Sequence, residues 1–275
     1  MEKNHSHYLK LAFENAKVNL GKTKMNPSVG CVIVKNDSVI SIGKTSILGR
    51  PHAEVNALKR KKNFKNADLY VSMEPCTHYG KTPPCTNLII KKGIKRVFFS
   101  SNDFDVRTAN LSKKKLIKNN VKVYKKIQKN FETFYQSYYI NKKKKEPYID
   151  AKIAISKDYY TINNKSKWIT NVHARKRAHL IRSEYDAIIS TSKSINDDNS
   201  QLNCRLEGFD NNKPDLLIID MKLRLKKDLK IFKDKNKRKI FLLTSAKNNK
   251  KKNFFKKLGI RIIFLKRLTV KSDLR

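Results

Sequence analysis

The sequence predicts an α/β protein made of two successive units, each a series of strands and helices. Three observations predict this fold class. Short apolar runs alternate with amphipathic segments, the first two runs form a hairpin, and a lysine-rich stretch ending in proline interrupts the series midway. Helices between strands indicate a layered arrangement in which helices cover a mixed sheet. At 275 residues the chain is long enough for two domains of ordinary size.

The first unit begins with an amphipathic segment, residues 1–17, and a hairpin. Residues 29–43 hold two apolar runs, VGCVIV and SVISIG, separated by Asn36 and Asp37, which suit a tight turn between antiparallel strands. The elements that follow alternate in type. They are a helix from His52, a strand over 68–73, a helix over 83–92, a strand over 96–100, a helix over 111–120, a strand over 121–124 and an aromatic-rich helix over 130–140.

The segment 141–147, NKKKKEP, is the predicted linker, because it combines a charge run with a proline. It divides the chain into a first domain, residues 1–145, and a second, residues 146–275. The second domain repeats the alternation of strands and helices. Its predicted elements are a strand over 148–156, a helix over 171–183, strands over 186–191, 215–220 and 239–245, a helix over 251–259 and a strand over 260–265.

Composition limits the class of protein. The formal net charge is +40, but the lysines are spread through every segment, which favours solvated faces over a nucleic-acid-binding stripe. Charge alone does not decide between the two. No run approaches the roughly 18 apolar residues of a membrane span, so we expect a cytoplasmic protein without a membrane partner. Four cysteines in a chain of this length predict reduced thiols.

Four residues have the types and spacing of a catalytic zinc site. His52 and Glu54 stand where a helix begins, Cys76 follows a strand, and Cys85 opens the next helix. One imidazole and two thiolates are a three-ligand zinc set that leaves the fourth position open, as in catalytic sites. Glu54 is placed to hold and transfer the proton of an attacking water. Helix N-termini also favour thiolates and other anions.

Two other interpretations stay open at this point. A single His-x-Glu occurs by chance in many chains, and neighbouring cysteines are more often buried small residues than ligands. A structural zinc site would need a fourth ligand, for which His78, His5 and His7 are the nearby choices. The conjunction of H-A-E, a strand, P-C and T-P-P-C favours the catalytic site over both.

These motifs resemble the zinc-dependent cytidine deaminase superfamily, whose signature is H-x-E followed by P-C-x-x-C. Here eight residues separate the two cysteines instead of two. The longer motif P-C-x-H-x-G-x-T-P-P-C, preceded by N-P-x-V-G at residues 26–30, resembles the bifunctional riboflavin biosynthesis proteins of bacteria. This resemblance implies a cytidine-deaminase-like three-layer α/β/α domain with a mixed sheet, followed by a dihydrofolate-reductase-like α/β domain.

For the first domain, the resemblance implies Zn²⁺-dependent deamination of a small phosphorylated substrate, a diaminopyrimidinone with a ribosylamino phosphate. Glu54 would transfer the proton, and Asn26 would hydrogen-bond the pyrimidine. His78 and Lys81, on the loop between the cysteines, would hold the ribose phosphate. A solvated surface lysine is an equal alternative for Lys81.

For the second domain, the resemblance implies reduction of the ribose to a ribityl chain with NADPH. The segments PYIDAKIAIS, SKWIT, HLIRSEYDAII and DDNSQLNCR support it. Arginine suits a phosphate because its guanidinium can bind two oxygens at once. The expected cofactor contacts are Ala154, Trp168, Ser194 and Asp198, and the expected substrate contacts are Ser166, Arg182, Leu202 and Arg205. Without the resemblance, Trp168 reads as a core aromatic and Arg182 as a surface charge.

The second domain departs from the family in two places. The family turn S-L-D-G reads SKDYY here, and the chain ends before the family's glycine-rich E-G-G segment. We therefore expect an incomplete reductase domain that reduces poorly or not at all. Its unpaired sheet edge would favour either association with another chain, as in a homo-oligomer, or partial disorder. The alternatives are a deaminase with a non-reducing second domain, a tRNA or nucleoside deaminase, and a zinc-stabilised scaffold in which Glu54 is dispensable.

Overall fold

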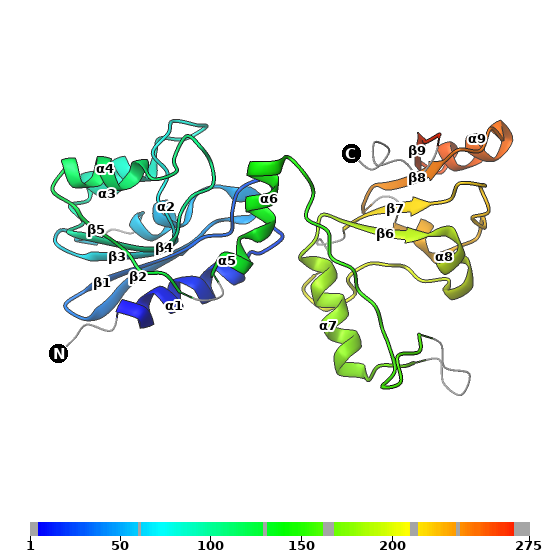
Figure 1. Ribbon diagram of the computed structural model, residues 1–275, viewed down its shortest axis with the longest axis horizontal. Helices are drawn as coiled ribbons and strands as arrows, with labels where there is room; N and C mark the ends of the chain where they lie inside the picture. The colour runs from blue at the N-terminus through cyan, green and yellow to red at the C-terminus, as the bar shows by residue number, and fades with distance from the viewer. Residues whose placement is uncertain are drawn as a thin grey trace. The chain divides into compact units, whose positions relative to one another are not determined.

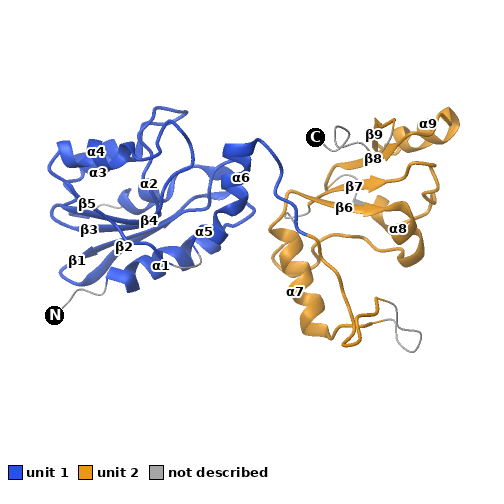
Figure 2. Ribbon diagram, viewed as in Figure 1, with its two compact units in different colours: residues 1–150 blue, residues 151–275 orange. Residues whose placement is uncertain are grey.

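The computed structural model describes residues 5–59, 62–128, 131–161, 168–209, 214–234 and 237–266. The chain divides into two compact units, residues 1–150 and 151–275 (Figure 2). The predicted boundary lies five residues earlier, after residue 145. Within the described ranges, no helix is long and apolar enough to cross a membrane.

Unit 1 is built on a five-stranded mixed sheet with the order β2-β1-β3-β4-β5 (Figure 1). The strand β1 pairs antiparallel with β2 and β3, whereas β3, β4 and β5 are parallel. The strands are β1 (Gly30–Lys35), β2 (Ser38–Lys44), β3 (Asp68–Met73), β4 (Arg96–Ser101) and β5 (Lys122–Lys125). The helices are α1 (His5–Lys17), η1 (Ile47–Gly49), α2 (Ala53–Leu58), α3 (Cys85–Lys91), α4 (Leu111–Lys118), α5 (Phe131–Phe134) and α6 (Gln136–Lys144).

Alternate residues of β1, β3 and β4 enter different cores, one on each face of the sheet. Cys31 and Ile33 of β1 pack in the core that includes buried residues of α2, α3 and α4. Val32 and Val34 pack with α1 in the other core. Figure 1 shows α1 on the opposite side of the sheet from α3 and α4. The period of two follows from strand geometry and confirms the predicted three-layer α/β/α arrangement.

Two glycines bring helices against the sheet. A Cβ at Gly30 would lie 1.9 Å from the carbonyl oxygen of Ala12 in α1. A Cβ at Gly43 would lie 2.2 Å from the carbonyl oxygen of Ala53, the first residue of α2. The absence of a side chain at Gly43 therefore lets the N-terminus of α2 approach β2, and this approach fixes the position of His52 and Glu54.

Unit 2 contains a four-stranded parallel sheet with the order β6-β7-β8-β9. The strands are β6 (Ala187–Thr191), β7 (Asp215–Ile219), β8 (Ile240–Thr244) and β9 (Arg261–Phe264). The helices are α7 (Val172–Ser183), α8 (Ser192–Asp198), η2 (Lys230–Asp234) and α9 (Asn249–Lys257). Asn171 and Asn248 cap α7 and α9, because their side chains accept hydrogen bonds from backbone N–H groups of the first turn.

Three expectations are corrected. The segment 148–156 is not a strand, although Ile149, Ile153 and Ile155 alternate along it. These side chains are exposed, and the segment pairs with no strand of the described sheets. Helix α6 runs to Lys144, so most of the predicted linker is helical. Helix α8 was not predicted, because its sequence SKSINDD is polar; a Thr191 cap and one buried apolar residue, Ile195, stabilise it.

Candidate functional site

The three predicted zinc ligands converge in unit 1. His52 is the N-cap of α2, Cys76 follows β3, and Cys85 is the first residue of α3. The Nδ1 atom of His52 lies 3.6 Å from Sγ of Cys76 and 3.5 Å from Sγ of Cys85. All three ligand atoms lie within 4.8 Å of one another. Residues distant in sequence thus present one nitrogen and two sulfurs to the same point.

Hydrogen bonds hold the ligand-bearing segments in place. The Asn56 side chain, on α2, donates to the carbonyl of Lys44 at 2.7 Å and to Oγ of Ser46 at 2.9 Å. These bonds tie the start of α2 to the end of β2. The backbone N–H of Cys85 donates to Sγ of Cys76 at 3.2 Å, and Thr86 donates to the Cys76 carbonyl. The helix N-terminus thereby orients a sulfur and favours its thiolate form.

The electrostatics of the site favour a bound cation. Hydrogen bonds from Cys85 and His52 lower the pKa of Cys76 to about 4. The hydrogen bond to Cys76 raises the pKa of His52, and the same thiolate together with burial raises the pKa of Cys85. The Cys76 thiolate therefore favours a proton on both His52 and Cys85. A metal ion bound between the three side chains would take the place of these protons. The donor types and their convergence fit zinc.

Glu54 lies beside this cluster in the first turn of α2 and is only 4% exposed. Burial, followed by the negative charge of Cys76, raises the pKa of Glu54 to about 7. A hydrogen bond also links its carboxylate to Cys85. A buried carboxylate that can exchange a proton near neutral pH is suited to general acid–base chemistry.

The other residues predicted for the first site lie on the loops that carry the ligands. Asn26 donates its amide to the Gly49 carbonyl at 3.0 Å, three residues before His52. The Nδ1 atom of His78 lies 2.8 Å from the Thr108 hydroxyl, and Lys81 is exposed on the same loop as His78. Asn26 and His78 are thus anchored next to ligand-bearing segments, whereas Lys81 is not placed by a described hydrogen bond.

Sequence reasoning missed two residues near this site. Arg50 donates to the hydroxyl of Thr82 at 2.6 Å, which joins the approach to α2 to the loop between the cysteines. Glu74 is buried, and its carboxylate accepts from the hydroxyl of Ser112 at 2.7 Å and from three backbone N–H groups. The signal for Glu74 was a charged residue directly after the largely apolar strand DLYVSM. No comparable signal marked Arg50.

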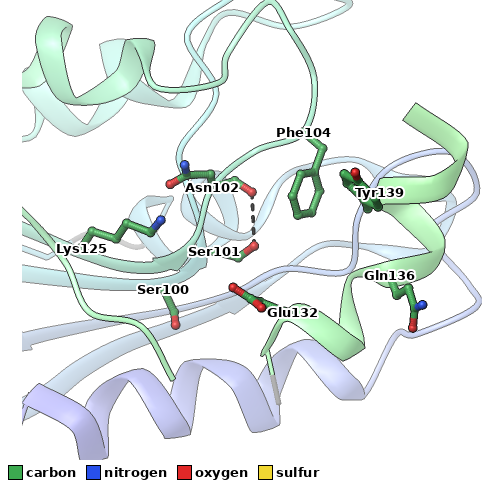
Figure 3. Close-up of a pocket in the computed structure, with 8 residues that line it drawn as sticks. All are labelled: Ser100, Ser101, Asn102, Phe104, Lys125, Glu132, Gln136 and Tyr139. Atoms are coloured by element: carbon green, nitrogen blue, oxygen red, sulfur yellow. Dashed lines mark hydrogen bonds between the residues drawn. The ribbon is translucent and has the colours of Figure 1, made fainter. Parts of the chain in front are cut away.

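A cavity of about 340 Å³ opens beside the end of β4, between that strand and α6 (Figure 3). No predicted site residue lines it. The lining residues are Ser100, Ser101, Asn102, Phe104, Lys125, Glu132, Gln136 and Tyr139.

In unit 2 the structure brings the two predicted substrate arginines to one residue, Asn203. Arg182 of α7 donates to the carbonyl of Asn203 at 3.3 Å, and Arg205 donates to the side-chain oxygen of Asn203 at 2.8 Å. Leu202, on the same loop, packs against the unit 2 core. The guanidinium of Arg238 supports this loop from within the unit, with a bond of 2.7 Å to the Leu202 carbonyl.

The predicted cofactor contacts are more scattered. Ala154 lies in the irregular segment before α7, and Trp168 is 55% exposed with the Arg175 guanidinium 4.4 Å from its ring centroid. Ser194 and Asp198 lie in α8. Within the described chain, no hydrogen bond or ion pair joins these four predicted contacts to one another. The predicted substrate contact at position 166 lies outside the described residues.

Comparison with known proteins agrees with both units. The cytidine and deoxycytidylate deaminase zinc-binding region matches residues 2–101, and the RibD C-terminal domain matches residues 147–275. The riboflavin biosynthesis protein RibD of Aquifex aeolicus is 32% identical over 98% of this chain and 76% of its own length. That of Actinobacillus pleuropneumoniae is 33% identical over 98% of this chain and 72% of its own length.

A crystal structure gives the same result. The Thermotoga maritima diaminohydroxyphosphoribosylaminopyrimidine deaminase/5-amino-6-(5-phosphoribosylamino)uracil reductase superposes with a TM-score of 0.85 at 29% identity, covering 98% of this chain and 76% of that one. The expectation of an incomplete second domain is not supported, because the RibD C-terminal domain matches residues 147–275. The chain belongs to the RibD family of riboflavin biosynthesis enzymes, with a zinc-dependent deaminase domain followed by an NADPH-dependent reductase domain.

Proposed function

We propose that the first domain deaminates diaminohydroxyphosphoribosylaminopyrimidine and that the second reduces the product, 5-amino-6-(5-phosphoribosylamino)uracil. The observation that carries the proposal is the convergence of His52, Cys76 and Cys85 beside the buried Glu54. The two activities named for the Thermotoga maritima enzyme support the choice of substrates.

In the first reaction, His52, Cys76 and Cys85 hold the zinc ion. When bound, zinc supplies Lewis-acid activation of water at neutral pH. The Glu54 carboxylate accepts a proton from the attacking water and delivers it to the leaving amino nitrogen. A carbon–oxygen bond forms, the carbon–nitrogen bond breaks, and ammonia leaves. The water-poor surroundings of Glu54 strengthen its hydrogen bonds to the reacting groups.

The remaining residues of the first site bind and orient the substrate. Asn26 hydrogen-bonds the pyrimidine edge, and His78 with Lys81 contacts the ribose phosphate. The hydrogen bond between His78 and Thr108 supports this role for His78, because it fixes the imidazole on the loop between the two cysteines.

In the second reaction, Arg182, Leu202 and Arg205 bind the aminouracil phosphate, together with the residue at position 166. The support is the approach of both guanidinium groups to Asn203, which leaves several donors of each fork available to an anion. Ala154, Trp168, Ser194 and Asp198 contact the cofactor. NADPH, when bound, supplies the hydride that converts the ribosyl group to a ribityl chain.

Four further features complete the proposal: the domain bounds, the location in the cell, the kind of partner and the oligomeric state. Residues 1–145 form the deaminase domain and residues 146–275 the reductase domain. The enzyme is cytoplasmic and acts on small molecules without a specific nucleic-acid partner, so RNA binding should be weak and steeply salt-dependent. The chain forms a homo-oligomer, which light scattering of the purified protein tests. The exposed Ile263 and Phe264 of β9, an outer strand of the described sheet, support self-association.

The decisive experiment supplies the purified chain with the diaminopyrimidine phosphate, with and without NADPH. We expect ammonia release in both cases and NADPH oxidation in the second. A strong chelator should stop ammonia release, and added zinc should restore it, while reduction of supplied aminouracil continues. Ammonia release from an RNA oligonucleotide but not from the pyrimidine would contradict the proposal.

A further inference from the structure

His179 lies among the groups proposed to bind the aminouracil phosphate. It is a half-buried residue of α7, one turn before Arg182. Its Nδ1 atom lies 3.0 Å from the carbonyl oxygen of Asn203, and its Nε2 atom lies 3.3 Å from Nη2 of Arg205. Both ring nitrogens therefore face the loop that carries Arg205.

The partners of the ring decide its protonation. A carbonyl oxygen only accepts hydrogen bonds, so Nδ1 must carry the proton that it shares with Asn203. The backbone N–H of Arg205 also lies 3.4 Å from Nδ1, but a nitrogen that donates cannot accept there as well. Guanidinium nitrogens only donate, so Nε2 must offer its lone pair to Arg205. His179 is thus neutral, with its proton on Nδ1.

The charges around the ring favour the same state. Arg182 faces the imidazole from α7, and Arg205 faces it from the loop. Burial, then Arg205 and Arg182, lower the pKa of His179. The thiol of Cys204, between Asn203 and Arg205 on the loop, is buried, and no carboxylate acts on the ring within the described residues.

We propose that His179 is a positioning residue of the reductase, whose neutral imidazole orients the Arg205 guanidinium toward the substrate phosphate. The proposal rests on the proposed role of Arg205. Two acceptors hold the guanidinium, Oδ1 of Asn203 at 2.8 Å and Nε2 of His179 at 3.3 Å. The remaining N–H groups of the fork stay available for phosphate oxygens. Protonation of His179 would replace the acceptor by a third cation and release Arg205.

The test compares substitutions at His179 in the full chain by steady-state reduction of the aminouracil phosphate. His179→Leu removes both ring nitrogens and should raise KM roughly tenfold or more, with little change in kcat. His179→Gln retains one donor and one acceptor and should recover most of that loss. His173→Leu, the same change at an exposed position of α7, is the matched control and should retain the wild-type KM.

The pH profile separates positioning from packing. Below about pH 6 the wild-type KM should rise more steeply than that of His179→Gln, because only the wild type has an imidazole to protonate. The substrate phosphate titrates in the same range but affects both enzymes equally. Identical profiles, or equal losses in the Leu and Gln variants, would overturn the proposal.

Arg205→Ala distinguishes a failure of this inference from a failure of the proposed function. If Arg205 binds the substrate, its removal raises KM, and the double variant His179→Leu/Arg205→Ala should be no worse than Arg205→Ala alone. A raised KM in Arg205→Ala with a wild-type KM in His179→Leu refutes the positioning role alone. A wild-type KM in Arg205→Ala refutes the proposed substrate contact and the inference with it.

Discussion

Replacing Gly43 by alanine should disable the zinc site through a backbone clash. The new Cβ would lie 2.2 Å from the carbonyl oxygen of Ala53 and 2.4 Å from the backbone nitrogen of Ala57. Both atoms belong to the backbone of α2, so no side-chain rotation relieves the contact. Ordinary van der Waals separation of about 3.5 Å returns only if α2 retreats from β2 by about 1 Å.

This retreat moves the residues at the start of α2 that are proposed to act in deamination. His52 caps the helix and Glu54 lies in its first turn, so both shift away from Cys76 and Cys85. A misplacement of about 1 Å can lower a rate roughly 100-fold, and overpacking also destabilises a domain by about 1–3 kcal/mol. We expect Gly43→Ala to bind clearly less than one zinc per chain and to deaminate roughly 100-fold more slowly, with reduction retained.

Elemental analysis, ammonia release and thermal unfolding of the same preparation test this expectation. Gly80→Ala is the matched control for zinc content, because a Cβ there meets only side-chain atoms, of Arg50 at 3.5 Å and of His78 at 3.8 Å. It should keep zinc. Full zinc content and wild-type deamination in a folded Gly43→Ala protein would refute the reasoning.

Two further predictions concern buried charged groups. Glu74→Gln replaces a carboxylate that accepts hydrogen bonds, two of them from Ser112, by an amide whose NH2 group can only donate. The free energy of unfolding should therefore fall by roughly 2–3 kcal/mol. Chemical denaturation checks this, and Glu132→Gln, at an exposed carboxylate, should change it by less than about 0.5 kcal/mol. Arg238→Met removes donors to the carbonyls of Leu202 and Gln201, so the reductase KM should rise while deamination continues. An unchanged KM would show that the loop around Leu202 keeps its conformation without the hydrogen bonds from Arg238.

The convergence of His52, Cys76 and Cys85 was predictable from sequence because its determinants are local. His52 and Cys85 each stand where a helix begins, and Cys76 follows a buried strand, so three short patterns locate all three predicted ligands. The alternation of strands and helices likewise predicted the mixed sheet. Spacing could not reveal the glycine contact at Gly43, because it depends on which helix crosses which strand.

Unit 2 was less predictable because its arrangement also depends on contacts between segments that are distant in the sequence. Residues 148–156 alternate like a strand, but a strand also needs a hydrogen-bonded neighbour, and alternation does not supply one. The grouping of His179 with Arg205 depends on a loop returning to α7 from 26 residues away. Tyr159 occupies a backbone position with φ +67°, where the family turn has glycine. The sequence located that departure, and the structure shows that the tyrosine adopts the left-handed conformation.

The most direct test of the account is the zinc content and deamination rate of Glu54→Gln, measured on one preparation. Glutamine has nearly the same shape as glutamate but cannot accept and return a proton, and His52, Cys76 and Cys85 remain in place. We expect about one zinc per chain, ammonia release at least roughly 1000-fold slower than wild type, and unchanged reduction of supplied aminouracil. Near wild-type ammonia release from the zinc-loaded variant would contradict the proposed role of Glu54.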